Sequence, residues 1–248
     1  MSDSQTFVSH LIELRSRLIK AVAAILIIVI VQLPFAGKIY ALMARPVMAY
    51  LPEGSSMIAT GVLSPFLTPF KMVFILGIII AMPFVLYQIW AFIAPGLYKS
   101  EKRIARPLLV SSIFLFYLGC LFAYFVIFPI LFQFIPSIAP EGVNYMPDIN
   151  SYLDIVVRLF FAFGIAFEMP IAVILMILMG VTTPEKLANN RPYVVVTVFI
   201  IGMLLTPPDI ISQTLMAIPM WLLFEIGIIM GRILKKKKTD RENTIAQD

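Results

Sequence analysis

Long apolar runs separated by short basic segments constrain this chain more than any other feature. Hydrophobic residues make up 60% of the 248 residues and charged residues only 13%, about half of the charged fraction that a water-soluble domain carries. Inside hydrocarbon, backbone polar groups must find their hydrogen bonds within the segment, which a helix provides. The sequence therefore predicts an all-α integral membrane protein.

We expect six transmembrane helices in one transmembrane domain over residues 1–231. The apolar runs lie at about 18–36, 70–94, 107–132, 156–179, 193–206 and 210–231. The first four can each cross a hydrocarbon core of about 30 Å at 1.5 Å per residue. The fifth run is shorter and is followed by Pro207-Pro208-Asp209, and proline cannot continue a helix. The fifth and sixth segments are therefore expected to form a hairpin of short helices.

Most of the basic residues lie in segments that share one side of the membrane when the six spans alternate in direction. They are Arg15, Arg17, Lys20, Lys99, Lys102, Arg103, Arg106, Lys186, Arg191, Arg232, Lys235, Lys236, Lys237, Lys238 and Arg241. The positive-inside rule then predicts that both termini are cytoplasmic. The tail, residues 232–248, is expected to be flexible. Its four consecutive lysines favour an anchor at the anionic leaflet, and so short a run beside a span does not indicate nucleic-acid binding.

Prolines interrupt the predicted spans. Pro83, Pro129, Pro170 and Pro219 lie within or near the span ends, where each removes a backbone hydrogen bond and can kink the helix. Kinked helices favour a concave, cup-like bundle over a straight one. Gly227 and Gly231 form a GxxxG pattern, which is a weak signal when it occurs once.

Glu168 is the least expected residue of the apolar runs. A charged carboxylate at the centre of a bilayer costs several kcal/mol, so we interpret Glu168 as a functional intramembrane residue. Gln213 is a second polar residue, four positions after Asp209, where it can cap the last helix or bind a partner helix. Glu225, near the inner end of the last span, can reach Arg232 or the lysine cluster, and we assign it no role.

Two acidic residues lie beside the ends of spans on the basic side. Glu13 belongs to an amphipathic stretch, residues 7–20, and precedes Arg17 by four residues, the favourable order for a helical ion pair. Glu101 is the single acid of a basic loop. Each alone is explained by a surface ion pair or by charge balance. Together they offer two carboxylates that suit a pair of arginines, because a guanidinium binds a carboxylate through two parallel hydrogen bonds.

Several function classes have little support. The chain has one cysteine, Cys120, and one histidine, His10, so we expect no disulfide framework and no histidine metal cluster. No GxxxxGK loop occurs, so we expect no nucleotide hydrolysis and no cofactor. A proton-coupled carrier of small molecules would also use Glu168 as a relay. An intramembrane hydrolase would need a nucleophile with a base and is the weakest alternative.

The chain resembles the TatC family, the multispanning core of the twin-arginine protein export system. Four stretches carry the resemblance, and they run from the beginning of the chain to its last span. They are His10–Leu18 (HLIELRSRL), Phe92–Arg103 (FIAPGLYKSEKR), Phe167–Pro170 (FEMP) and Leu204–Gln213 (LLTPPDIISQ). The cytoplasmic loop of the family often has histidine before its glutamate, where this chain has Ser100.

The resemblance implies a receptor in the bacterial inner membrane, not an enzyme. It would bind twin-arginine signal peptides and organise the single-span partners TatA and TatB, in a larger complex with self-association, to export folded proteins with the proton-motive force. The implied signal-peptide residues are Glu13, Glu101, Leu14, Phe92, Leu97, Tyr98, Lys99 and Arg103. Glu168 is the implied intramembrane residue, and Pro46 the implied residue of the first outer loop. The implied partner-binding residues are Met203, Thr206, Asp209 and Gln213.

Overall fold

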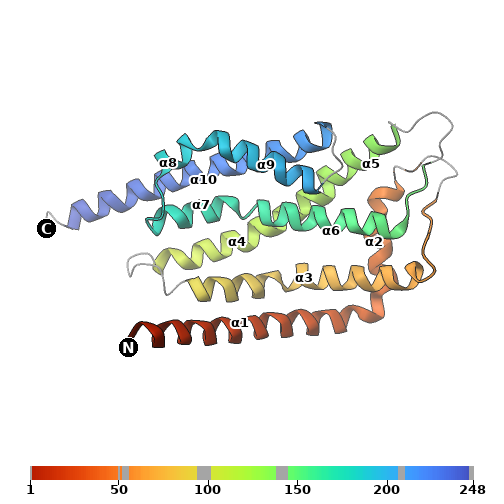
Figure 1. The fold of residues 1–248 in the computed structure, drawn as a ribbon, viewed down its shortest axis with the longest axis horizontal. Helices are drawn as coiled ribbons and strands as arrows, with labels where there is room; N and C mark the ends of the chain where they lie inside the picture. Colours follow the sequence, from red (N-terminus) through yellow and green to blue (C-terminus); the bar gives the residue numbers. More distant parts are fainter. Residues whose placement is uncertain are drawn as a thin grey trace. The chain divides into compact units, whose positions relative to one another are not determined.

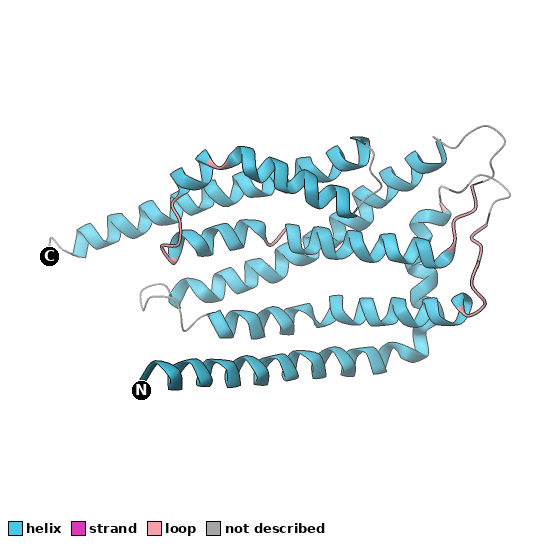
Figure 2. Cartoon of the chain, in the orientation of Figure 1, coloured by secondary structure: helices cyan, strands magenta, loops and turns pink. Residues whose placement is uncertain are grey.

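The chain is almost entirely helical in the computed structural model, which describes residues 2–49, 51, 56–93, 102–137, 145–205 and 210–245. No β-strand occurs in these ranges, as Figure 2 shows. The contacts divide the chain into two compact units, one formed by residues 1–96 and 124–157 and the other by residues 97–123 and 158–248. The prediction of an all-α chain is confirmed.

The first unit contains the N-terminal helices. Helix α1 (Ser2–Gln32) ends at a short 3-10 turn, η1 (Leu33–Phe35), and the chain then bends into α2 (Ala36–Met48), as Figure 1 shows. Helix α3 (Ser64–Ile93) packs along α1, and α5 (Phe128–Ser137) contacts α2. The beginning of α6 (Ile149–Ala166) completes this unit, where the buried Tyr152 donates a hydrogen bond from its hydroxyl group to the carbonyl of Met43.

The second unit is built on the C-terminal helix. It contains α4 (Lys102–Phe122), the end of α6, α7 (Met169–Leu178), the short α8 (Pro184–Asn189), α9 (Arg191–Leu205) and α10 (Ile210–Ile245). Helix α10 packs against α7, α8 and α9. The core of this unit includes two apolar clusters, one around Met220 and Val198 and the other around Phe224 and Ile177.

Five helical segments of the described chain are long and apolar enough to cross a membrane. They cover Leu11–Met48, Ser64–Ile93, Ala105–Ser137, Ile149–Leu178 and Gln213–Lys236. The segment Arg191–Met203 is apolar but shorter, as expected for the fifth run. The apolar side chains of α1 are widely exposed, for example Ile27 at 63% and Val31 at 65%, which suits a helix that faces lipid.

Two expectations about helix boundaries were wrong. The sixth helix is not short, because α10 has 36 residues and remains helical through the basic tail to Ile245. Pro46 lies in the last turns of α2 and not in a loop, because the outer segment after residue 36 continues as a helix. The fourth run forms one span-length segment, Ile149–Leu178, which is interrupted at Phe167–Glu168 between α6 and α7, next to the proline at which a kink was expected.

Two of the four span prolines coincide with interruptions of a helix. Pro170 lies in the first turn of α7, directly after the break, and its missing N–H leaves the carbonyl of Ala166 without its helical partner. Pro129 follows a π-helical stretch, η3 (Ala123–Ile127). Pro83 and Pro219 lie inside helices that are continuous in secondary structure.

The glycines of the GxxxG pattern let α10 approach α7 closely. A Cβ atom on Gly227 would lie 2.9 Å from the Cα atom of Pro170, and one on Gly231 would lie 2.3 Å from a terminal carbon of Ile177. The pattern therefore serves packing within this chain, because Gly227 faces backbone that no side-chain rotation can move away.

A polar clasp joins the segment before α3 to the start of α6. Ile58 and Asp148 form a parallel β-bridge, and both the N–H and the hydroxyl group of Thr60 donate to Asp148 Oδ1, at 3.0 and 2.9 Å. Asp148 Oδ2 accepts from the N–H groups of Asn150 and Ser151, both at 3.1 Å, which caps the first turn of α6. The hydrogen bond from the backbone of Thr60 is the largest cause that lowers the pKa of Asp148 to about 2.

We expect Asp148→Ala to lower the Tm of the detergent-purified protein by a few degrees, because one carboxylate both caps α6 and holds the segment around Thr60. The control is Asp154→Ala, which removes an exposed acid of the same helix. Since folding lowers the pKa of Asp148, its contribution should be complete above the usual value of 3.8 and disappear as the pH falls toward 2. Equal Tm values for the two variants would contradict the clasp.

Candidate functional site

Glu13 is held by an arginine of its own helix. In α1, the Nε and Nη2 atoms of Arg17 both donate to Glu13 Oε1, at 2.9 and 2.5 Å, which confirms the predicted pair four residues apart. The third nitrogen, Nη1, makes a long hydrogen bond of 3.4 Å to Gln88 Oε1 of α3. The Glu13 side chain is 33% exposed, and Leu14 beside it is 46% exposed. A carboxylate is thus presented at a surface in a defined orientation.

Glu168 lies at the break between α6 and α7, where it is the N-cap residue of α7 without using its side chain as a cap. Its N–H donates to the carbonyl of Ile165 at 3.0 Å, and its carbonyl accepts from the N–H of Ala172 at 2.9 Å. The side chain is therefore available for another helix. The hydroxyl group of Ser112 in α4 donates to Glu168 Oε2 at 2.6 Å.

The Ser112–Glu168 contact depends on a close crossing of α4 and α6. A Cβ atom on Gly119 of α4 would lie 2.5 Å from the carbonyl oxygen of Phe163, and one on Gly164 of α6 would lie 2.6 Å from the ring of Phe116. The contact pairs descend along α4 as they ascend along α6, so the two helices are antiparallel. Because neither glycine has a side chain, the facing helix can approach closely at both positions. The next contact along this crossing is the one between Ser112 and Glu168.

The carboxylate of Glu168 is only partly satisfied. Ser112 is fully buried, while Glu168 Oε1 is buried and has no hydrogen-bond partner among the described residues. Leaving a buried acceptor unpaired costs free energy of about 1–3 kcal/mol. A half-satisfied carboxylate inside an apolar segment is typical of a functional site and not of a packing position.

The hairpin of α9 and α10 brings the predicted partner-binding region together in part. Gly202 of α9 faces Gln213 of α10, since a Cβ atom on Gly202 would lie 3.8 Å from the Gln213 carbonyl. Met203 is 52% exposed and Gln213 is half-buried. A hollow of about 190 Å³ lies on the same hairpin. It is lined by Val195, Val198, Phe199, Ala217, Ile218 and Trp221.

Several predicted site residues lie outside the described residues. They are Leu97, Tyr98, Lys99, Glu101, Thr206 and Asp209. Arg103 lies in α4, where only its backbone is described, and Phe92 is half-buried in the last turn of α3. Glu13 and Glu168 belong to different units, so each is a separate cluster.

The structure adds two side chains that sequence reasoning missed. Ser112 and Gln88 are small or neutral polar residues in apolar runs, and only their burial next to Glu168 and Arg17 identifies them. Glu225, for which the sequence suggests Arg232 or the lysine cluster as a partner, forms its ion pair with Arg191, whose Nε and Nη2 atoms donate to it at 2.5 and 2.7 Å. No group of three potential metal ligands occurs in the described part of the chain.

The comparisons with known proteins agree over almost the whole chain. Residues 9–219 match the family described as Sec-independent protein translocase protein (TatC). The chain is 58% identical over 231 residues to the TatC protein of Azotobacter chroococcum, covering 93% of this chain and 91% of that protein. It is 52% identical over 242 residues to TatC of Escherichia coli K12, covering 98% and 94%. A crystal structure titled as the twin-arginine translocase receptor TatC matches with a TM-score of 0.80 at 41% identity, covering 90% of this chain and 98% of that one.

We expect Ser112→Ala to destabilise the protein by about 0.5–1.5 kcal/mol, the usual size for a hydrogen bond between membrane helices. The same substitution should cost almost nothing in a Glu168→Ala background, because the acceptor is then absent. Ser111→Ala, one position away and half-buried, is the matched control. Unfolding in mixed detergent would measure these differences, and an equal cost of Ser112→Ala in both backgrounds would contradict the pairing.

Proposed function

We propose, from the premise that this chain belongs to the TatC family of Sec-independent protein translocase proteins, that it binds twin-arginine signal peptides and organises the export of folded proteins. The observation that supports this function most directly is the near-full-length similarity to a solved protein titled as a twin-arginine translocase receptor. As a protein translocase component, the chain acts by binding, and the family implies that the proton-motive force drives transport.

The chemistry of recognition would use two carboxylates. Glu13 is oriented by Arg17 and retains an oxygen, Oε2, to which no described residue donates. Glu101 would supply the second acid, next to Leu97, Tyr98, Lys99 and Arg103, with Leu14 and Phe92 as apolar neighbours. Each glutamate would bind one arginine of the signal, because a guanidinium and a carboxylate form charge-assisted hydrogen bonds.

Partner proteins would bind at the intramembrane polar residues. TatA and TatB are single-span proteins, and a single apolar helix needs a polar contact to set its register along this chain. Glu168 carries an unpaired acceptor, and Gln213 with Met203, Thr206 and Asp209 would form a second polar region on the α9–α10 hairpin. The apolar hollow lined by Trp221 and Phe199 fits the side chains of a helix laid beside it.

The membrane arrangement follows from charge and length. We propose six spans with both termini in the cytoplasm of a bacterial inner membrane, five of them formed by the long helical segments and the sixth by the shorter α9. The basic residues of the N-terminal helix, of the segment around α8 and of the end of α10 would then face the cytoplasm. Glu13 would lie on the cytoplasmic side, from which signal peptides arrive.

Site-specific photocrosslinking of a twin-arginine signal peptide, with probes beside Glu13 and Glu101 in native membranes, tests the receptor function. We expect crosslinks that fall roughly tenfold or more with Glu13→Ala, with Glu101→Ala and with a twin-lysine peptide, since each change removes a charge-assisted contact. Asp154→Ala is the control for loss of an acid. Crosslinks that ignore both glutamates in correctly inserted protein would exclude this function.

A proton-coupled carrier is the competing function, because it too would use the buried carboxylate of Glu168. A carrier acts without partners, so proteoliposomes that contain only this chain should then show substrate-dependent proton uptake. We expect no such uptake and no transport of a folded passenger until the single-span partners are added. Proton uptake by the chain alone that is lost in Glu168→Gln would favour the carrier.

A further inference from the structure

The carboxylate of Glu13 already binds a guanidinium, the same group that a signal arginine would bring. The Arg17 fork closes on one oxygen, with both Nε and Nη2 on Oε1. This geometry differs from the parallel arrangement in which a guanidinium uses both carboxylate oxygens. Among the described residues nothing donates to Oε2, so within the described part of the chain this half of the carboxylate is available to a ligand.

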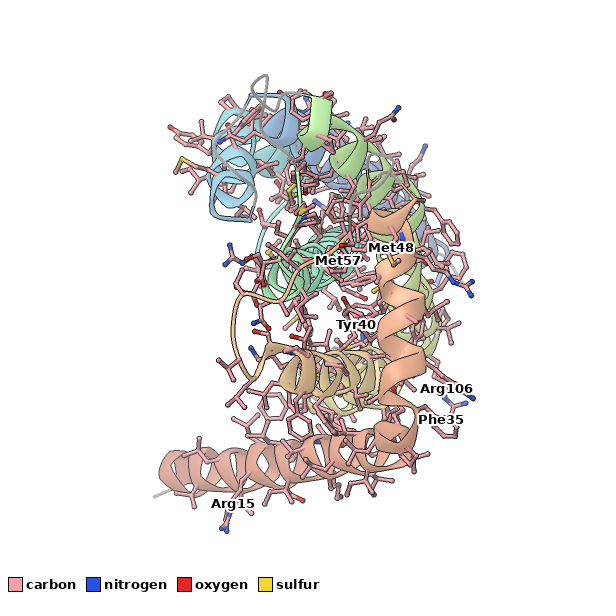
Figure 3. All side chains as sticks on the ribbon, turned by 90° about the vertical axis from the view of Figure 1, so that its right-hand side faces the viewer. Arg15, Phe35, Tyr40, Met48, Met57 and Arg106 are labelled. Carbon is pink, nitrogen blue, oxygen red and sulfur yellow. The ribbon has the colours of Figure 1, made fainter. Side chains whose placement is uncertain are left out.

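Arg17 is fixed from its other side by a buried amide. Gln88 is only 7% exposed and accepts from the remaining Arg17 nitrogen at 3.4 Å. The Arg17 side chain is 23% exposed, so it lies between α1 and α3 and not in free solvent. Arg15 makes a contrast, because in Figure 3 its side chain points away from α3 on the opposite side of α1. Of these two arginines, only Arg17 is placed to modify Glu13.

We propose that Arg17 is a specificity-determining residue that makes Glu13 prefer arginine to lysine in a bound peptide. This inference rests on the proposed receptor function. A bare carboxylate attracts any cation, and an ammonium group binds as a compact point charge. The positive charge of Arg17 offsets that general attraction, because the Glu13–Arg17 pair carries no net charge.

The attraction that Glu13 still offers to a ligand is directional hydrogen bonding. The open oxygen Oε2 can still accept short hydrogen bonds from a planar donor, and a guanidinium offers several in fixed geometry. A guanidinium is also more weakly hydrated than an ammonium, so it loses less on leaving water for a site that already contains a cation. Because Arg17 offsets the charge of Glu13 while Oε2 can still accept hydrogen bonds, the affinity for lysine is lowered more than the affinity for arginine.

Binding of fluorescent signal peptides to the full-length protein in nanodiscs tests this inference. The peptides carry either two arginines or two lysines. The quantity of interest is the Kd of the twin-lysine peptide divided by the Kd of the twin-arginine peptide. We expect Arg17→Gln to strengthen twin-lysine binding by about 1.5-fold to fivefold, the range for one partly exposed charge pair, with a smaller change for twin-arginine. The ratio should therefore fall.

Two further variants separate specificity from general effects. Arg17→Lys keeps a positive charge beside Glu13 and should restore the ratio of the unmodified protein. A purely structural role of the guanidinium would not predict this recovery. Lys20→Gln removes one exposed charge from the same helix and should leave the ratio unchanged. A ratio that stays the same in Arg17→Gln, or that falls equally in Lys20→Gln, would overturn the inference.

Glu13→Ala distinguishes this inference from the function on which it rests. If twin-arginine binding persists unchanged in Glu13→Ala, the receptor site at Glu13 is wrong and the inference falls with it. If binding requires Glu13 but the ratio is insensitive to Arg17, the receptor function remains and only the role of Arg17 is rejected. Thermal unfolding of each variant verifies that the compared proteins are folded.

Discussion

The absence of water around the apolar runs is the constraint from which the rest of this structure follows. Backbone groups must then bond within each segment, which makes every long segment a helix. The same constraint acts on side chains. In each unit, some polar residues near or within the spans meet a partner from another element, as Asn150 meets Thr68 at 2.6 Å and Glu168 meets Ser112 at 2.6 Å. Helix pairing is thereby specified by a few polar contacts within an apolar surface that is otherwise unspecific.

The two acidic clusters use their partners in different ways. Glu13 lies at the surface and pairs with a full opposite charge, which leaves one carboxylate oxygen to which no described residue donates. Glu168 lies in an apolar segment and accepts a hydrogen bond from a neutral hydroxyl group on one oxygen. Its other oxygen has no hydrogen-bond partner among the described residues. An aqueous ligand with charged groups suits the first arrangement. A membrane partner with a single polar side chain suits the second.

Most of the secondary structure could be predicted from the sequence, because span length and apolar character are local properties. The segment Ser64–Ile93 and the short α9 agree with the apolar runs. The boundaries were less predictable where a helix continues into polar sequence, as α10 does through its lysines, since helix formation there does not depend on burial. Likewise the Glu13–Arg17 pair is local and was predicted, whereas Gln88 lies 71 residues from Arg17 and Ser112 lies 56 from Glu168. Those pairings depend on which helices cross and how closely, and no local pattern encodes them.

The crossing of α4 and α6 has a genetic consequence, because its two glycines are not equivalent. The ring of Phe116 blocks a side chain at Gly164, so a smaller residue at position 116 could make room and act as a suppressor within the same chain. A side chain at Gly119 instead meets the carbonyl oxygen of Phe163, and no substitution can shorten a backbone. A defect caused by a substitution at position 164 should therefore be reversible by a second mutation at the facing residue, Phe116. A defect caused by a substitution at position 119 should be reversible only by a return to glycine.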